Sequence, residues 1–218
     1  MKIEKYSKTN YSKLEELLNS YSHGIGIFLG IIGFWLLLKD VLVFEDNIKL
    51  ISILLFGSTM TFTYVSSTLY HFIKKRDAKR FFLMLDHIAI FLFLGGTFSS
   101  WVLIEPLTTF KIVALTTIWS LSISGVFLRL FIFKRTGLIL EGLYLLLAIV
   151  GSLFGISLYF SLGFNALSLA LLGGFFYTVG LIFYYISQLK FNHLLWHVFV
   201  MIGNFTHYML ISNYILPY

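Results

Sequence analysis

Seven long apolar stretches separated by short polar breaks dominate this sequence of 218 residues. A stretch of about 20 apolar residues is the length that an α-helix needs to cross the hydrocarbon core of a membrane. The stretches extend over residues 24–43, 50–73, 81–104, 112–133, 138–160, 164–186 and 194–216. Only 12% of the residues are charged, whereas soluble domains average about 25%. The sequence therefore predicts an all-α fold, with residues 1–218 forming one membrane domain, a seven-transmembrane helix bundle.

The positions of the basic residues predict how this bundle is oriented. When the spans are counted from the amino terminus, thirteen of the 16 Lys and Arg residues fall on the amino-terminal side of the membrane. Cytoplasmic segments carry such an excess of Lys and Arg. We therefore expect a multi-pass protein of the cell membrane with a cytoplasmic amino terminus and a carboxyl terminus outside. The same asymmetry accounts for the net charge of +6 without a nucleic-acid partner.

The sequence pattern of residues 1–23, which precede the first span, predicts an amphipathic helix at the membrane surface. Ser12 and Glu15 have the Ser-x-x-Glu spacing of a capping box, which marks the start of a helix. Apolar side chains then recur at the spacing of one helical face, namely Leu14, Leu17, Leu18 and Tyr21.

Composition and topology exclude several kinds of site. The chain has no Cys, so disulfides, iron–sulfur clusters and thiolate metal sites are excluded, and a metal ion could be held only by His nitrogen and carboxylate oxygen. The predicted orientation is the reverse of that of a G-protein-coupled receptor. The last span contains no Lys, so a retinal Schiff base has no attachment point there.

A few ionisable residues fall inside the predicted spans, where such side chains are costly and usually mark function. His71 lies at the inner end of the second span, and Asp86 lies at the inner start of the third. His193 and His197 open the seventh span at the same depth. Four ionisable groups from three helices are therefore expected to meet near the cytoplasmic face.

The spacing of these residues suits a metal ion. His193 and His197 are four residues apart, which puts both imidazoles on one helical face, as in the His-x-x-x-His part of metalloprotease motifs. Ser67 and His71 have the same spacing on the second span. With His71 as a third imidazole, the group would form a three-His site with one position open for water.

Structural interpretations of the same residues remain open at this point. His71 could be an interfacial side chain, and Asp86 could pair with Lys79 or Arg80 near the lipid headgroups. Ser67 could serve helix packing or hydrogen-bond to its own helix.

Two further His residues also fall within the predicted bundle. His207 lies about 15 Å farther along the last span than His197, too far to share its metal ion. We expect it to form hydrogen bonds within the bundle. His23 and Asn19 lie at the depth of the predicted site and are expected to support its ligands.

The sequence resembles the hemolysin III family, the bacterial branch of the progestin and adiponectin receptor group, within a superfamily that includes the alkaline ceramidases. The resemblance covers nearly the whole chain. It is carried by Asn-Ser-Tyr-Ser-His-Gly-Ile-Gly at 19–26, Ser-Thr-Leu-Tyr-His at 67–71, Leu-Asp-His at 85–87, Gly-Gly-Thr-Phe at 95–98, Gly-Gly-Phe-Phe-Tyr-Thr-Val-Gly-Leu-Ile-Phe-Tyr at 173–184 and His-Leu-Leu-Trp-His-Val-Phe-Val at 193–200.

This resemblance implies a seven-helix fold with a cytoplasmic amino terminus and a zinc ion held by His71, His193 and His197. It also implies that Ser67 and Asp86 belong to the same site. Zinc is preferred because of the resemblance, since imidazole ligands also suit copper, nickel and iron.

The leading functional expectation is a zinc-dependent hydrolase that cleaves an amide or ester of a membrane lipid near the inner leaflet. Asp86 would be the general base, and Ser67 would orient Asp86 or the attacking water. A receptor or sensor with structural zinc, in which Asp86 is a fourth ligand, is the first alternative. A pore-forming cytolysin, which the family name suggests, is the second. The sequence does not indicate an oligomeric state.

Overall fold

The computed structural model describes residues 11–44, 46–104, 108–132 and 138–217, and within these ranges the regular structure is entirely helical. The first four helices are α1 (Lys13–Phe44), α2 (Asn47–Phe72), α3 (Arg76–Val102) and α4 (Thr109–Phe127). They are followed by α5 (Leu138–Gly155), α6 (Ser157–Leu162), α7 (Phe164–Tyr185) and α8 (Asn192–Leu210). A π-helical turn extends α4 over Leu128–Ile132, and another extends α8 over Ile211–Ile215.

Seven of the described segments are long and apolar enough to cross a membrane. Each long helix supplies one of them, and the short α6 completes the span that α5 begins, over Ile139–Leu162. The predicted all-α bundle of seven spans is therefore confirmed, and the chain is a multi-pass membrane protein.

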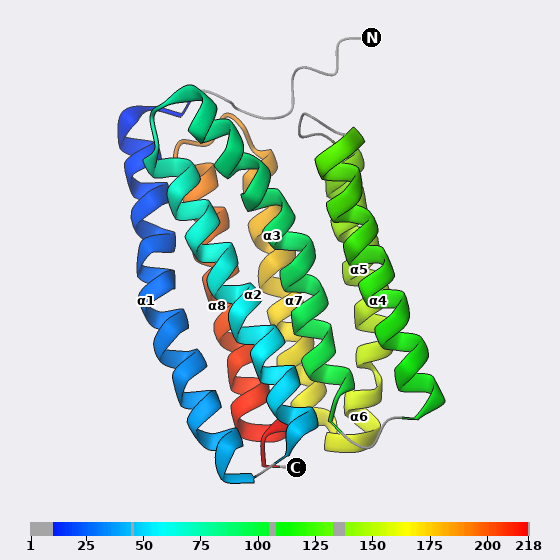
Figure 1. Cartoon of the computed structure of the whole chain (residues 1–218). Coiled ribbons are helices and arrows are strands. Elements are labelled where there is room, and N and C mark those ends of the chain that lie inside the picture. The colour runs from blue at the N-terminus through cyan, green and yellow to red at the C-terminus, as the bar shows by residue number, and fades with distance from the viewer. Residues whose placement is uncertain (1–10, 45, 105–107, 133–137, 218) are drawn as a thin grey trace.

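The helices run roughly parallel to one another along the length of the bundle (Figure 1). α2 packs against both α1 and α3, and α8 packs against both α7 and α1. α4 and α5 pack against each other and against α3, and the short α6 packs against α7. Aromatic and aliphatic side chains such as Phe56, Phe91 and Ile118 fill the interior with no exposed surface. The carboxyl end of α2 and the amino end of α8 lie at the same end of the bundle (Figure 1).

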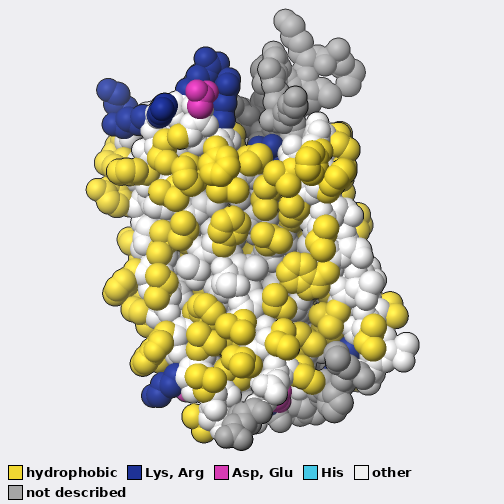
Figure 2. Space-filling model, viewed as in Figure 1, with side chains coloured by type: hydrophobic (Ala, Val, Ile, Leu, Met, Phe, Trp, Pro, Cys, Tyr) yellow, Lys and Arg dark blue, Asp and Glu magenta, His cyan; other side chains and the backbone are white. Residues whose placement is uncertain are grey.

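The outer surface is apolar, as contact with lipid requires. Hydrophobic side chains cover most of the face shown in Figure 2, and Lys and Arg gather mainly at one end. Large apolar residues on this exterior are widely exposed, for example Phe28 at 67% and Phe205 at 62%. Because water would penalise such exposure and lipid does not, the middle of the bundle belongs in the hydrocarbon layer.

The structure differs from the sequence expectation between residues 13 and 23. The expected surface helix is instead the first part of α1, which continues without a break to Phe44. The capping box is present, with Ser12 N–H donating to Glu15 Oε2 at 2.8 Å and Glu15 N–H donating to Ser12 Oγ at 3.2 Å. The physical reason for the difference is burial, because Asn19, Ser20 and His23 pack inside the bundle. Residues 1–10 of the expected helix lie outside the described residues.

Candidate metal centre

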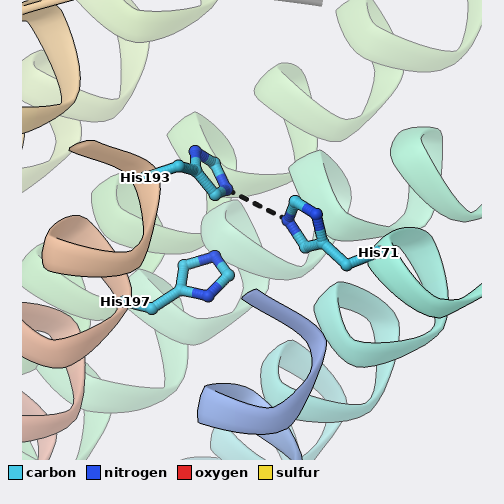
Figure 3. A group of neighbouring side chains, drawn as sticks. All are labelled: His71, His193 and His197. Atoms are coloured by element: carbon cyan, nitrogen blue, oxygen red, sulfur yellow. Dashed lines mark hydrogen bonds between the residues drawn. The ribbon is translucent and has the colours of Figure 1, made fainter. Parts of the chain in front are cut away.

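Three buried imidazoles from two helices meet at one end of the bundle. His71 lies in the last turn of α2, whereas His193 and His197 lie in the first turns of α8 (Figure 3). One potential ligand nitrogen from each ring lies within 4.8 Å of the other two. The Nε2 atoms of His71 and His193 are 3.0 Å apart. The structure therefore brings together the three imidazoles that the sequence selected.

The start of α8 is held in place by polar contacts on both sides. The Asn192 side-chain amide donates to the Tyr184 carbonyl of α7 at 2.8 Å. The Phe191 N–H donates to Glu15 Oε1 of α1 at 3.3 Å. Phe191 has a φ of 60°, a left-handed conformation that costs a non-glycine residue about 1–2 kcal/mol. These contacts fix where α8 begins and thus where His193 and His197 lie relative to α1 and α7.

The other ring nitrogen of His71 bonds to a carboxylate. His71 Nδ1 lies 2.7 Å from Glu16 Oε2, and Lys79 Nζ donates to Glu16 Oε1 at 2.9 Å. A carboxylate only accepts hydrogen bonds, so the proton of His71 is on Nδ1 and Nε2 keeps its lone pair. This carboxylate–imidazole pair is the arrangement that commonly orients metal-binding His residues.

His197 is oriented in the same way by α1. Its Nδ1 lies 3.1 Å from the Asn19 carbonyl oxygen and 2.9 Å from Ser22 Oγ. Ser22 donates its own hydroxyl hydrogen to the Asn19 carbonyl at 2.8 Å. Both groups therefore accept from the His197 Nδ1–H, which leaves the lone pair on Nε2.

His193 completes the pattern with Tyr11, which precedes α1. Its Nδ1 lies 3.2 Å from the Tyr11 hydroxyl. Burial raises the pKa of that hydroxyl, so Tyr11 stays neutral and can either accept from or donate to the ring. All three rings thus have a partner at Nδ1, and one nitrogen of each ring faces a shared space (Figure 3).

This donor set fits a metal ion chemically. Two imidazole nitrogens 3.0 Å apart must share a proton or a cation, since two lone pairs facing each other repel. The nitrogen of the third ring lies nearby. A metal cation can bind all three nitrogens at once, whereas a proton can be shared by only two. Neutral His nitrogens fixed through Nδ1 are ordinary ligands of zinc.

Asp86 and Ser67 lie together, outside this cluster. A hydrogen bond joins the Ser67 side chain to the Asp86 carboxyl group. Among the described residues, Asp86 is not part of the group of converging ligand atoms. A purely structural interpretation would pair Asp86 with Lys79 or Arg80. Lys79 instead forms an ion pair with Glu16.

The two remaining His residues of interest occupy different surroundings. His23 stacks on His197, with ring centroids 3.7 Å apart and planes within 15° of parallel. His207 lies deeper in the bundle, where its Nε2 donates to the Ala170 carbonyl at 3.2 Å. The expectation that His207 bonds within the bundle is confirmed.

Sequence reasoning did not identify Glu16, Tyr11 or Ser22 as partners of the three imidazoles. Each lies in the first described turns of the chain, far in sequence from the His residue that it contacts. The clearest available signal was two adjacent carboxylates, Glu15 and Glu16, at the start of an apolar helix. The capping box accounts for Glu15 but indicates no role for Glu16.

Comparison with known proteins shows which family this chain belongs to. The family described as "Haemolysin-III related" matches residues 11–208, which include Tyr11 and all three imidazoles. The chain belongs to the haemolysin-III-related family.

Members of this family with curated descriptions align over most of their length. The chain is 33% identical to "Hemolysin-3 homolog" of Bacillus subtilis (strain 168), over 87% of this chain and 89% of that protein. It is 31% identical to "Hemolysin-3" of Bacillus cereus, over 98% of both chains. A more distant human protein, "Monocyte to macrophage differentiation factor", is 25% identical over 97% of this chain and 87% of its own.

Proposed function

We propose that this haemolysin-III-related protein is a zinc-dependent hydrolase that cleaves an amide or ester bond of a membrane lipid near one face of the bilayer. The observation that carries the proposal is the cluster of His71, His193 and His197, buried within membrane-spanning helices and with every Nδ1 already engaged. Three His ligands leave a fourth position open, as in catalytic rather than structural zinc sites. When bound, zinc would supply a Lewis acid and lower the pKa of a coordinated water molecule.

Asp86 is proposed as the general base. Its carboxylate would accept a proton from the attacking water at one oxygen and later release it to the departing amine or alcohol. The Ser67 hydroxyl, which bonds to that carboxyl group, would hold it in the required orientation. Because Asp86 lies outside the converging ligand atoms, we assign it to proton transfer rather than to the metal.

A membrane lipid is the substrate class that this location favours. The three imidazoles are 9% exposed or less and lie within segments that span the bilayer. A molecule that already resides in the membrane can approach such a site laterally. A closed structural zinc site, as in a sensor, would require a fourth protein ligand, and the described cluster contains three.

The word "hemolysin" in the names of two relatives raises cytolysis through a pore as the other candidate. A pore needs a polar path across the membrane. The cavity that Tyr64 and Phe205 line has an almost wholly apolar lining, so this cavity does not provide such a path.

The hydrolase proposal is tested with a long-chain N-acyl amide and the matching ester. Purified wild-type protein should release the fatty acid from at least one of them. Asp86→Asn should retain zinc but lose about 10²–10⁴-fold in rate, the usual contribution of a general base. His197→Ala should lose both zinc and turnover. Wild-type rates in both variants would show that the residues do not act as proposed.

A further inference from the structure

A cavity of about 280 Å³ lies between α1, α2 and α8. Its lining is almost wholly apolar and includes Gly26, Gly30 and Gly33 of α1. Two other lining residues, Leu29 and Phe205, are 55% and 62% exposed on the outer surface. All these residues belong to membrane-spanning segments. The cavity therefore opens sideways toward the hydrocarbon layer.

Three glycines on one face of α1 line this cavity and let the Tyr64 and Tyr208 rings pack closely against the helix. Gly26, Gly30 and Gly33 follow the i, i+4, i+7 pattern of a single helical face. A Cβ at Gly30 would lie 3.3 Å from the Tyr64 ring, and one at Gly33 would lie 3.2 Å from the Tyr208 ring. Between Gly26 and Leu36, which both line the cavity, the helix rises about 15 Å. The cavity is thus elongated along the membrane normal.

The inner end of the cavity lies against the metal centre. The Tyr64 ring lines the cavity and meets the His23 ring, with centroids 5.2 Å apart. His23 in turn stacks on His197, with centroids 3.7 Å apart. One layer of side chains therefore separates the apolar cavity from the proposed catalytic site.

Polar atoms without partners occur at this junction. Both ring nitrogens of His23 and both polar atoms of the Asn19 side chain are buried and have no hydrogen-bond partner among the described residues. His23 is 3% exposed and Asn19 is 1% exposed. Buried polar atoms are nearly always paired, so these four atoms mark a place for a polar group that is not part of the described chain.

The order of these features along α1 matches the order of groups in a lipid. Asn19 and His23 lie near the membrane face, and Gly26, Gly30 and Gly33 follow toward the bilayer centre. We infer that the cavity binds one acyl chain of the lipid on which the metal centre acts, with the polar part of that lipid at Asn19 and His23. This inference rests on the proposed hydrolase function. An unbranched chain is the occupant that fits, because an apolar volume of about 280 Å³ that extends over about 15 Å of helix is narrow.

The test uses protein in phosphatidylcholine nanodiscs and a dodecanoyl amide that carries a photoreactive diazirine near the middle of its chain. After illumination, mass spectrometry locates the labelled residues. We expect labelling within residues 26–36 of α1 and 201–208 of α8, with competition by unlabelled dodecanoyl amide. Even labelling of all lipid-facing helices would mean that ordinary bilayer lipid covers this surface, and the inference would be wrong.

Variants that fill the cavity sharpen this test. Gly30→Leu should reduce the specific labelling about tenfold or more, since each displaced methylene contributes roughly fourfold to binding. Leu29→Trp should act similarly from an exposed position if Gly30→Leu fails to fold. Gly174→Leu is the matched control, because Gly174 is exposed on α7 with no neighbour within 4 Å. Unchanged labelling in the cavity variants would overturn the inference.

Zinc content and hydrolysis of the unlabelled amide are measured on the same samples. Specific labelling without any hydrolysis would refute the proposed catalysis but leave the acyl-chain site standing. Hydrolysis that is insensitive to Gly30→Leu and Leu29→Trp, with labelling outside the cavity, would refute only the acyl-chain site. The two proposals therefore fail in different ways.

Discussion

At the scale of single residues, the main feature of this protein is the set of partners at the Nδ1 atoms of three imidazoles. Glu16 bonds to His71, Tyr11 to His193, and the Asn19 carbonyl to His197. These partners differ in chemistry but have the same effect. Each directs the opposite nitrogen of its ring into one shared space, which is how proteins prepare His residues for a metal ion.

Glu16 provides the sharpest residue-scale prediction. Glu16→Gln keeps the shape of the side chain but removes the charge that pairs with His71 and Lys79. We expect zinc affinity to fall about 10–100-fold, the usual effect of losing such a partner. Zinc dissociation constants from competition with a chelator provide the measurement. Asp77→Asn, at an exposed carboxylate on the same end of the bundle, should leave the affinity unchanged, and an unaltered affinity in Glu16→Gln would refute this role.

The sequence predicted the three imidazoles but not their partners, for a physical reason. His193 and His197 share a helical face, so their spacing alone places them together. Glu16 and His71 are 55 residues apart in the chain, and their contact depends on how α1 packs against α2. One sequence provides no rule for that packing, so Glu16, Tyr11 and Ser22 were not identified.

At the scale of helices, glycine residues determine how closely α7 and α8 approach. A Cβ at Gly173 would collide with the His207 ring, and a Cβ at Gly203 would lie 2.6 Å from the Tyr177 ring. The rings fill the space that the glycines leave, and Tyr177 donates to Asn204 at 2.6 Å across the same contact. Small residues serve this purpose between membrane helices in general.

Two adjacent glycines allow this packing to be tested. Gly173→Ala should destabilise the protein by about 1–3 kcal/mol, because the added methyl overpacks the contact. The His207 ring cannot move away without losing its bond to Ala170. Gly174→Ala has open space and should be neutral or up to about 1 kcal/mol stabilising through helix propensity. Thermal unfolding in detergent should therefore rank Gly173→Ala below the wild type, and equal midpoints for the two variants would contradict the packing described.

Helix boundaries show where sequence patterns were sufficient and where they were not. The Ser12–Glu15 capping box correctly marked a helix start. The apolar face that begins at Leu14 favoured a separate surface helix, yet the chain continues into α1 as far as Phe44. No Gly or Pro breaks the helix between these residues and the first span, and buried Asn19 and His23 require this part of α1 inside the bundle.

At the scale of the whole molecule, the orientation in the membrane remains a prediction from the distribution of Lys and Arg. The absence of Cys makes it simple to test with single cysteines and a membrane-impermeant maleimide on intact cells. Asn165→Cys, at an exposed position in the first turn of α7, should react from outside. Lys75→Cys, in the loop before α3, should react only after permeabilisation. The opposite pattern would place the metal centre near the outer face.

The central claim is that three imidazoles hold one metal ion inside the membrane, and metal content tests it most directly. Protein purified without chelators is analysed by mass spectrometry for zinc per chain, beside His71→Ala, His193→Ala and His197→Ala. His207→Ala is the matched control, since His207 is equally buried but bonds elsewhere. We predict about one zinc ion per chain, retained in His207→Ala and lost in each of the other variants. Wild-type protein without metal, or zinc that persists in those three variants, would contradict the proposed metal centre.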